Sequence, residues 1–189
     1  MGLKDFTNSK LGTVVVLAVT TGLILGGLWL VKGRGDGLSQ VTLPANAAQR
    51  PPAVGEAATT FSAVDTNGVE VDLAQLRGQP VWLVFGATWC SNCRAEAADI
   101  EAVQQKLGDQ VAIVAIYIGE DGPTVQDYAQ RVGLTFTQLP DPDKRLAAAY
   151  RVMGFPAHYF VDKNGQVAQV KVGAISQKTA SDLLGQLLG

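Results

Sequence analysis

The sequence predicts an α/β domain, with a central mixed β-sheet flanked by helices, joined to an N-terminal transmembrane helix. Short apolar runs typical of strands alternate with helical patterns, and a hairpin pattern stands at each end of this series. A separate uncharged apolar stretch occupies residues 11–31. The chain has 189 residues and a formal net charge of −2, which suit one domain with appendages and give no basis for nucleic-acid binding.

The apolar stretch at residues 11–31 predicts a membrane anchor. As a helix it would be about 31 Å long, which matches the roughly 30 Å hydrocarbon core of a bilayer. A cleaved signal peptide is the alternative, but its apolar region is usually only about 7–15 residues long. Basic residues flank both ends of the stretch, so charge does not set its orientation. We therefore expect a short stub at residues 1–10 and an uncleaved anchor at 11–31.

The segment after the anchor predicts a tether. Residues 32–53 are rich in glycine, proline and alanine and show no sustained periodicity. A flexible segment of this length reaches about 25 Å on average. We therefore expect a flexible linker at residues 32–53 and a folded domain at residues 54–189, held near the bilayer.

The first part of the domain predicts a hairpin followed by a buried strand. Two β-like runs, at residues 61–64 and 69–71, surround an Asn-Gly pair, which is a strong hairpin signal. Asp72 is placed to cap a short helical turn. Residues 80–85 are almost continuously apolar, as expected for a strand that is buried on both faces.

The middle of the domain predicts two helices around a second buried strand. A helical apolar pattern begins at Cys93 and ends at Gly108, and residues 111–118 form another continuous apolar run. Pro123 opens the next helix, at a position where proline is tolerated, and Gly133 closes it.

The last part of the domain predicts a helix, a second hairpin and a final helix. Asp143 is placed to cap the first of these helices. Residues 157–161 and 166–172 are β-like runs around an Asn-Gly turn. Ser176 is placed to cap the last helix, which is rich in leucine.

Cys90 and Cys93, the only two cysteines, stand where the buried strand at residues 80–85 gives way to a helix. A Cys-x-x-Cys pair at such a junction predicts thiol–disulfide chemistry, with the pair forming a redox-active disulfide. Unpaired N–H groups at the helix start favour a thiolate, so we expect the pKa of Cys90 to lie below the free value of about 8.5. Cys90 is then the nucleophile and Cys93 the resolving thiol. A permanent disulfide and half of a zinc site are the alternatives, but no second pair completes such a site.

Four short segments carry a resemblance to a known family. They are Leu-Arg-Gly-Gln-Pro at residues 76–80, the run at 85–94 with its Trp-Cys-Ser-Asn-Cys, Gly-Glu at 119–120 and Gly-Phe-Pro at 154–156. The domain resembles the thioredoxin-like superfamily, and most closely the membrane-anchored TlpA/ResA-like thiol–disulfide oxidoreductases. The resemblance implies a thioredoxin-like fold. It also implies a single-pass protein of the cell membrane whose stub is cytoplasmic and whose catalytic domain is extracytoplasmic.

The resemblance also implies roles for residues outside the cysteine pair. Pro156 would follow a cis peptide bond, and Trp89, Phe155 and Pro156 would bind the substrate's extended chain. Thioredoxins carry a buried aspartate where this chain has Val84. Glu120 matches an acidic residue of the TlpA/ResA-like branch and would exchange protons with the resolving thiol.

The sequence departs from the family at two places. Gly86 replaces the aromatic residue usual before Ala87, and Ser91-Asn92 replaces a proline-containing dipeptide between the cysteines. That dipeptide affects the reduction potential, so we do not place the protein on the scale from about −270 mV to about −120 mV.

The resemblance implies reduction of disulfides in extracytoplasmic proteins, with apocytochrome c or its delivery partners as the candidate substrate and a membrane thiol donor as the source of electrons. We expect no cofactor and no metal. An oxidant or isomerase of the same fold is one alternative. Another is a copper(I)-binding module in which His158, the only histidine, joins Cys90 and Cys93.

Overall fold

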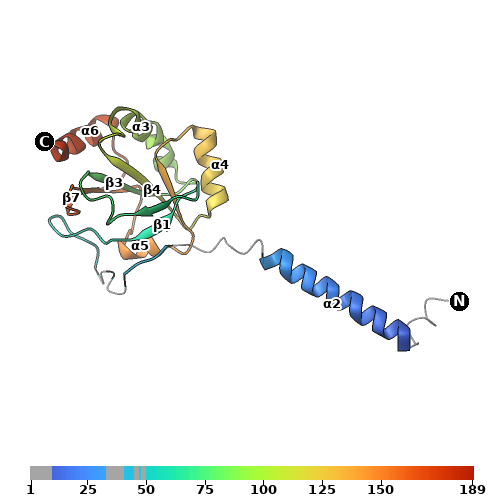
Figure 1. Cartoon of the computed structure of the whole chain (residues 1–189). Coiled ribbons are helices and arrows are strands. Elements are labelled where there is room, and N and C mark those ends of the chain that lie inside the picture. The colour runs from blue at the N-terminus through green and yellow to red at the C-terminus, as the bar shows by residue number, and fades with distance from the viewer. Residues whose placement is uncertain (1–9, 33–40, 45–46, 48–49) are drawn as a thin grey trace. The chain divides into compact units, whose positions relative to one another are not determined.

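The computed structural model describes residues 10–32, 41–44, 47 and 50–189 (Figure 1). The chain divides into two compact units, residues 1–38 and 39–189. The first contains helix α2 (Lys10–Lys32). A search of the described part finds no helix that is both long enough and apolar enough to cross a membrane. The predicted stub, apart from Lys10, lies outside the described residues.

A five-stranded mixed sheet forms the centre of the second unit, in the order β5-β4-β3-β6-β7. β3 (Val81–Gly86) pairs parallel with β4 (Ala112–Ile118), and β4 pairs parallel with β5 (Thr137–Asp141). On its other side β3 pairs antiparallel with β6 (Ala157–Val161), which pairs antiparallel with β7 (Val167–Val172). Every residue of β3 is buried, because β3 is the central strand and both sheet faces are covered.

Two hydrophobic cores cover the two faces of this sheet. Helices α3 (Ser91–Leu107) and α6 (Gln177–Leu188) lie on one face, with α4 (Gly122–Val132) towards its β5 edge (Figure 1). Helix α5 (Arg145–Ala149) and the hairpin of β1 (Ser62–Val64) and β2 (Glu70–Asp72) cover the other. The predicted α/β class, with a mixed sheet flanked by helices, is confirmed.

Most predicted elements are confirmed, including both hairpins and the buried strands. Pro123 lies in the first turn of α4, and Gly133 ends it in a left-handed conformation. Ser176 caps α6 by accepting a hydrogen bond from the Thr179 N–H. Helix α3 begins at Ser91, two residues before its predicted start, because Cys90 itself is the N-cap.

Two local predictions are wrong. Asp72 caps no helix: its carboxylate accepts a hydrogen bond from the Ala74 N–H within a run of turns. Asp143 does not cap α5 either. The buried Asp141 takes that part, accepting hydrogen bonds from the N–H groups of Leu146 at 3.1 Å and Ala147 at 2.9 Å. A carboxylate that is already enclosed by the core outcompetes an exposed one for these donors.

The domain extends further towards the N-terminus than the predicted boundary at residue 54. Val41 is buried, and its carbonyl accepts a hydrogen bond from Arg145. Thr42 pairs with Ser62 of β1 through two backbone hydrogen bonds. These contacts fix residues 41–44 against the hairpin, whereas most of the remaining predicted linker lies outside the described residues.

Candidate active site

The site stands where β3 ends and α3 begins. Cys90 has an extended backbone and caps the helix, and its Sγ accepts a hydrogen bond from the Cys93 N–H at 3.1 Å. The two cysteines are joined as a disulfide, with their Cα atoms 5.3 Å apart. A sulfur that occupies a helix N-cap receives N–H donors and the positive end of the helix dipole. The arrangement therefore favours a thiolate at Cys90 once the disulfide is reduced.

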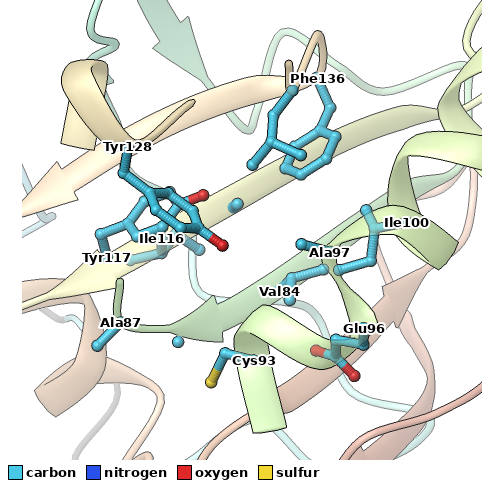
Figure 2. Close-up of a pocket in the computed structure, with 13 residues that line it drawn as sticks. Val84, Ala87, Cys93, Glu96, Ala97, Ile100, Ile116, Tyr117, Tyr128 and Phe136 are labelled. Carbon is cyan, nitrogen blue, oxygen red and sulfur yellow. The ribbon is translucent and has the colours of Figure 1, made fainter. Parts of the chain in front are cut away.

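A small cavity of about 30 Å³ is lined in part by Cys93 (Figure 2). Cys93 and Glu96 enter it from α3, and Tyr117 and Tyr128 line it from the side of β4 and α4. A space of this size has room for a water molecule. Cys93 and Glu96 are three residues apart on one helix, so their side chains share a face. A carboxylic acid and the resolving cysteine therefore line the same cavity.

Glu96 is 3% exposed, and burial raises its pKa to about 7. Its Oε2 accepts a hydrogen bond from the Ile175 N–H at 3.1 Å, while its Oε1 has no partner among the described residues. A carboxyl group with a pKa near neutrality both takes up and releases a proton at physiological pH. Glu96 was not among the predicted site residues, although its position three residues after Cys93, next to the apolar face of the predicted helix, was a usable signal.

His158 lies on β6 and is 0% exposed. Its Nε2 is 3.2 Å from the Gly173 carbonyl and 3.6 Å from Glu96 Oε2, and burial lowers its pKa to about 4. At physiological pH the ring is therefore neutral, and Nε2 donates to the carbonyl. No cluster of three or more His, Cys, Asp or Glu side chains in the described part is arranged to hold a metal ion. His158 is engaged with Glu96 and Gly173, so the copper alternative gains no support.

Two of the predicted substrate-binding residues meet directly before the disulfide. Trp89 is 65% exposed, and its ring meets that of Phe155 edge to face, with the ring centroids 5.4 Å apart. The Phe155–Pro156 peptide bond is cis, as the resemblance implied. Trp89 is exposed and Phe155 is half-buried, so the two rings offer an apolar contact to a partner next to Cys90.

Glu120 lies after β4 and is 8% exposed. Its Oε2 accepts a hydrogen bond from the Thr88 N–H at 2.7 Å, and its Oε1 accepts one from the Thr88 hydroxyl at 2.5 Å. The carboxylate thus fastens the turn that leads to Cys90. Glu120 does not line the cavity beside Cys93. Its predicted proton exchange with the resolving thiol stays a prediction.

Val84 lies on β3 directly opposite His158 of β6 and also lines the cavity beside Cys93. Directly opposite residues on neighbouring strands share a face of the sheet. Val84 is therefore an apolar residue at the position where thioredoxins carry an aspartate. Helix α3 supplies an acid, Glu96, and the neighbouring strand β6 supplies an imidazole, His158. Sequence order alone does not reveal this convergence.

The similarity of this chain to known proteins agrees with the fold and the cysteine geometry. Residues 54–170 match the AhpC/TSA family. The chain belongs to this family. Among its relatives is the thiol-disulfide oxidoreductase ResA of Geobacillus kaustophilus, which is 35% identical over 129 residues, covering 67% of this chain and 73% of the relative.

Two solved structures of thiol–disulfide oxidoreductases share the fold. A thiol:disulfide interchange protein DsbE from Chlorobium tepidum superposes with a TM-score of 0.68 at 25% identity, covering 73% of this chain and 99% of that one. A secreted Mycobacterium tuberculosis disulfide oxidoreductase, homologous to the DsbE of E. coli, superposes with a TM-score of 0.61 at 31% identity, covering 67% and 96%. The chain is a thioredoxin-like thiol–disulfide oxidoreductase of the ResA and DsbE type.

Proposed function

We propose that this oxidoreductase is anchored in the cell membrane by a single helix and reduces disulfides of proteins outside the cytoplasm. The observation that carries the proposal is the Cys90–Cys93 disulfide at the start of α3, bordered by the exposed Trp89 and the cis Phe155–Pro156 bond. The uncharged stretch at residues 11–31 supports an anchor. The secreted Mycobacterium tuberculosis relative supports an extracytoplasmic location, where disulfides are common.

The first chemical step uses Cys90. In the reduced enzyme its thiolate attacks one sulfur of a partner disulfide, forms a Cys90–partner bond and releases the other partner sulfur as a thiolate. The Cys93 N–H, which points at Cys90 Sγ at 3.1 Å, stabilises the negative charge before attack. An extended partner chain lies against Trp89, Phe155 and Pro156 in this step.

The second step uses Cys93 and a base. The Cys93 thiol gives its proton to the Glu96 carboxylate across the shared cavity, and the resulting thiolate attacks Cys90 Sγ. The Cys90–Cys93 disulfide forms, and the partner's second sulfur leaves as a thiolate. Two electrons have passed to the partner, and a membrane thiol donor returns two electrons to the oxidised pair.

The candidate substrate is apocytochrome c or one of its delivery partners, by resemblance to the TlpA/ResA-like branch. A partner of this kind presents a disulfide in an extended segment, which fits a contact surface made by the exposed Trp89 and the half-buried Phe155 better than a closed pocket. The direction of electron flow follows from the redox state of the Cys90–Cys93 pair in growing cells. A reductase is held there mainly as the dithiol, and an oxidant mainly as the disulfide.

The experiment that tests the proposal is trapping with Cys93→Ser. Without the resolving thiol, we expect a stable mixed disulfide between Cys90 and the partner, seen as a higher band on non-reducing gels and identified by mass spectrometry. Cys90→Ser is the matched control and should trap nothing. The absence of any trapped species with Cys93→Ser would contradict the mechanism, and capture of partners without disulfides would contradict the substrate class.

A further inference from the structure

We propose that His158 is a positioning residue of the redox reaction: its ring N–H holds the Glu96 carboxylate beside Cys93 and helps it to ionise. The inference rests on the proposed function through the proton exchange between Glu96 and Cys93. It concerns a residue that takes no part in the disulfide chemistry itself. His158 lies close to Glu96, which lines the cavity beside Cys93.

The contacts of the carboxyl group converge on one of its oxygens, Oε2. Nε2 of His158 lies 3.2 Å from the Gly173 carbonyl and 3.6 Å from Glu96 Oε2. The same Oε2 accepts the Ile175 N–H at 3.1 Å. The loop between β7 and α6 thus orients the imidazole with one backbone group and the carboxyl with another. The carbonyl of Gly173 only accepts, so Nε2 carries the proton and donates it to Gly173, while Glu96 Oε2 lies 3.6 Å from the same nitrogen, just beyond hydrogen-bond distance.

A purely structural role does not account for an imidazole here. All residues of β6 are buried, and the Trp82 and Phe160 rings fill the same core as His158. Within the described residues, His158 Nδ1 and Glu96 Oε1 are buried polar atoms without a hydrogen-bond partner. Leaving polar atoms unpaired in a core costs free energy that an apolar side chain avoids. The pair therefore indicates a function beyond packing.

Within the described residues, few other charged or titratable side chains lie near His158 and Glu96. Asp99, also on α3, raises the pKa of Glu96 through like charge, but less than burial does. Lys171 of β7 stands opposite His158 in register and is exposed. Tyr128 faces the cavity from α4, and burial raises its pKa. No side chain among these replaces the imidazole N–H as a donor to Glu96.

The expected mechanism follows from these contacts. When Glu96 ionises, it keeps the Ile175 N–H and draws on the His158 N–H as a second donor. Hydrogen bonds to the charged form of a carboxyl favour that form. Without the imidazole, Glu96 would stay protonated to higher pH, and Cys93 would lose its proton acceptor near neutral pH.

The first test uses the reduced full-length protein without substitution. His158 is the only histidine, so its ring nitrogens give unambiguous NMR signals after histidine ¹⁵N labelling. Between about pH 5 and about pH 8 we expect a neutral ring with the proton on Nε2, and a step in the chemical shifts of both nitrogens when Glu96 titrates. Glu96→Gln should remove the step. A ring that does not sense pH, or a step that survives Glu96→Gln, would overturn the inference.

The second test measures the rate at which iodoacetamide alkylates Cys93 in a Cys90→Ser background. His158→Phe removes the N–H and keeps an aromatic ring, and should move the midpoint of the pH profile upwards. A midpoint that lies one pH unit higher lowers the alkylation rate below it about tenfold. His158→Gln keeps a donor and should restore the midpoint. Equal midpoints in all three proteins would overturn the inference. If His158→Phe does not fold, the NMR test decides.

Glu96→Gln separates this inference from the proposed function. If Glu96→Gln leaves the pH profile of Cys93 unchanged, the proton step of the proposed function fails. If Glu96→Gln removes the pH step while His158→Phe leaves the midpoint in place, only the role of His158 fails.

Discussion

Around Cys93, several residues stand in place of the single buried aspartate that thioredoxins carry. Val84 occupies the strand position opposite His158, and Glu96 brings its carboxyl from α3. Glu120, the acidic residue that sequence resemblance singles out, instead binds Thr88. Two carboxyl groups therefore serve the site from different sides: one borders the resolving thiol and the other holds the turn before the nucleophile.

The two carboxyl groups make separable predictions for Cys93 reactivity. We expect Glu96→Gln to remove the step near pH 7 from the pH profile of Cys93 alkylation, because the group with a pKa of about 7 is gone. Glu120→Gln should keep the midpoint and slow reduction of a model disulfide several-fold, because one acceptor for Thr88 becomes a donor. A shifted midpoint in Glu120→Gln would instead support the predicted proton exchange between Glu120 and Cys93.

Glu96 and His158 also predict an unusual dependence of stability on pH. The pKa of Glu96 is raised from 4.5 to about 7, so between those values the folded state binds more protons than the unfolded state, and stability falls as pH rises. The pKa of His158 is lowered from 6.5 to about 4, so between those values stability rises with pH. Each effect reaches about 3 kcal/mol, and the two oppose each other where the windows overlap.

The measurement is urea unfolding of the oxidised protein at several pH values across the overlap from 4.5 to 6.5. We expect a nearly flat profile for the unsubstituted protein, a rising one for Glu96→Gln and a falling one for His158→Phe. Parallel profiles in all three proteins would show that neither group is perturbed in the folded state.

At the scale of elements, the site depends on how closely α3 approaches β3. A Cβ added at Gly86 would lie 3.1 Å from Cys93 Sγ and 3.3 Å from Cys93 Cβ. The glycine at the end of β3 therefore leaves the space that the resolving cysteine occupies. Glycine stands here in place of the family's aromatic residue, and its lack of a side chain leaves room for Cys93.

Gly86→Ala should destabilise the oxidised enzyme by roughly 1–3 kcal/mol, because the disulfide prevents Cys93 from moving away. The reduced enzyme should lose less, since a free Cys93 side chain can rotate. Chemical unfolding of both forms measures the difference. Gly154→Ala is the matched control, because its Cβ would lie 3.9 Å from Val172. Equal losses in the oxidised and reduced forms would contradict the proposed close contact.

At the scale of the whole molecule, the catalytic unit and helix α2 are separate compact units, joined by a segment of which residues 41–44 pack on the domain. The proposed anchor predicts that the full chain stays with the membrane pellet after carbonate extraction. A chain without residues 1–32 should be released in soluble form and keep its disulfide reductase activity. Recovery of the full chain in the carbonate supernatant would refute the anchor.

The sequence by itself determined the features that depend on near neighbours in the chain. Asn-Gly turns located the hairpins, continuous apolar runs located the buried strands, helical apolar patterns located the main helices, and the Cys-x-x-Cys spacing located the reactive pair. Resemblance added the cis bond before Pro156, which chain statistics alone would not predict.

Only the tertiary structure decided which distant residues meet. β5 escaped prediction because Gln138 and Pro140 break its apolar pattern; the structure satisfies Gln138 through the Tyr117 hydroxyl and tolerates the proline on an edge strand. Glu96 lies on α3 and His158 on β6, and the packing of this helix on the sheet brings the two side chains within 3.6 Å of each other. Strand register and helix packing are long-range properties, so no local pattern encodes the contact between an acid on one helix and an imidazole on a later strand.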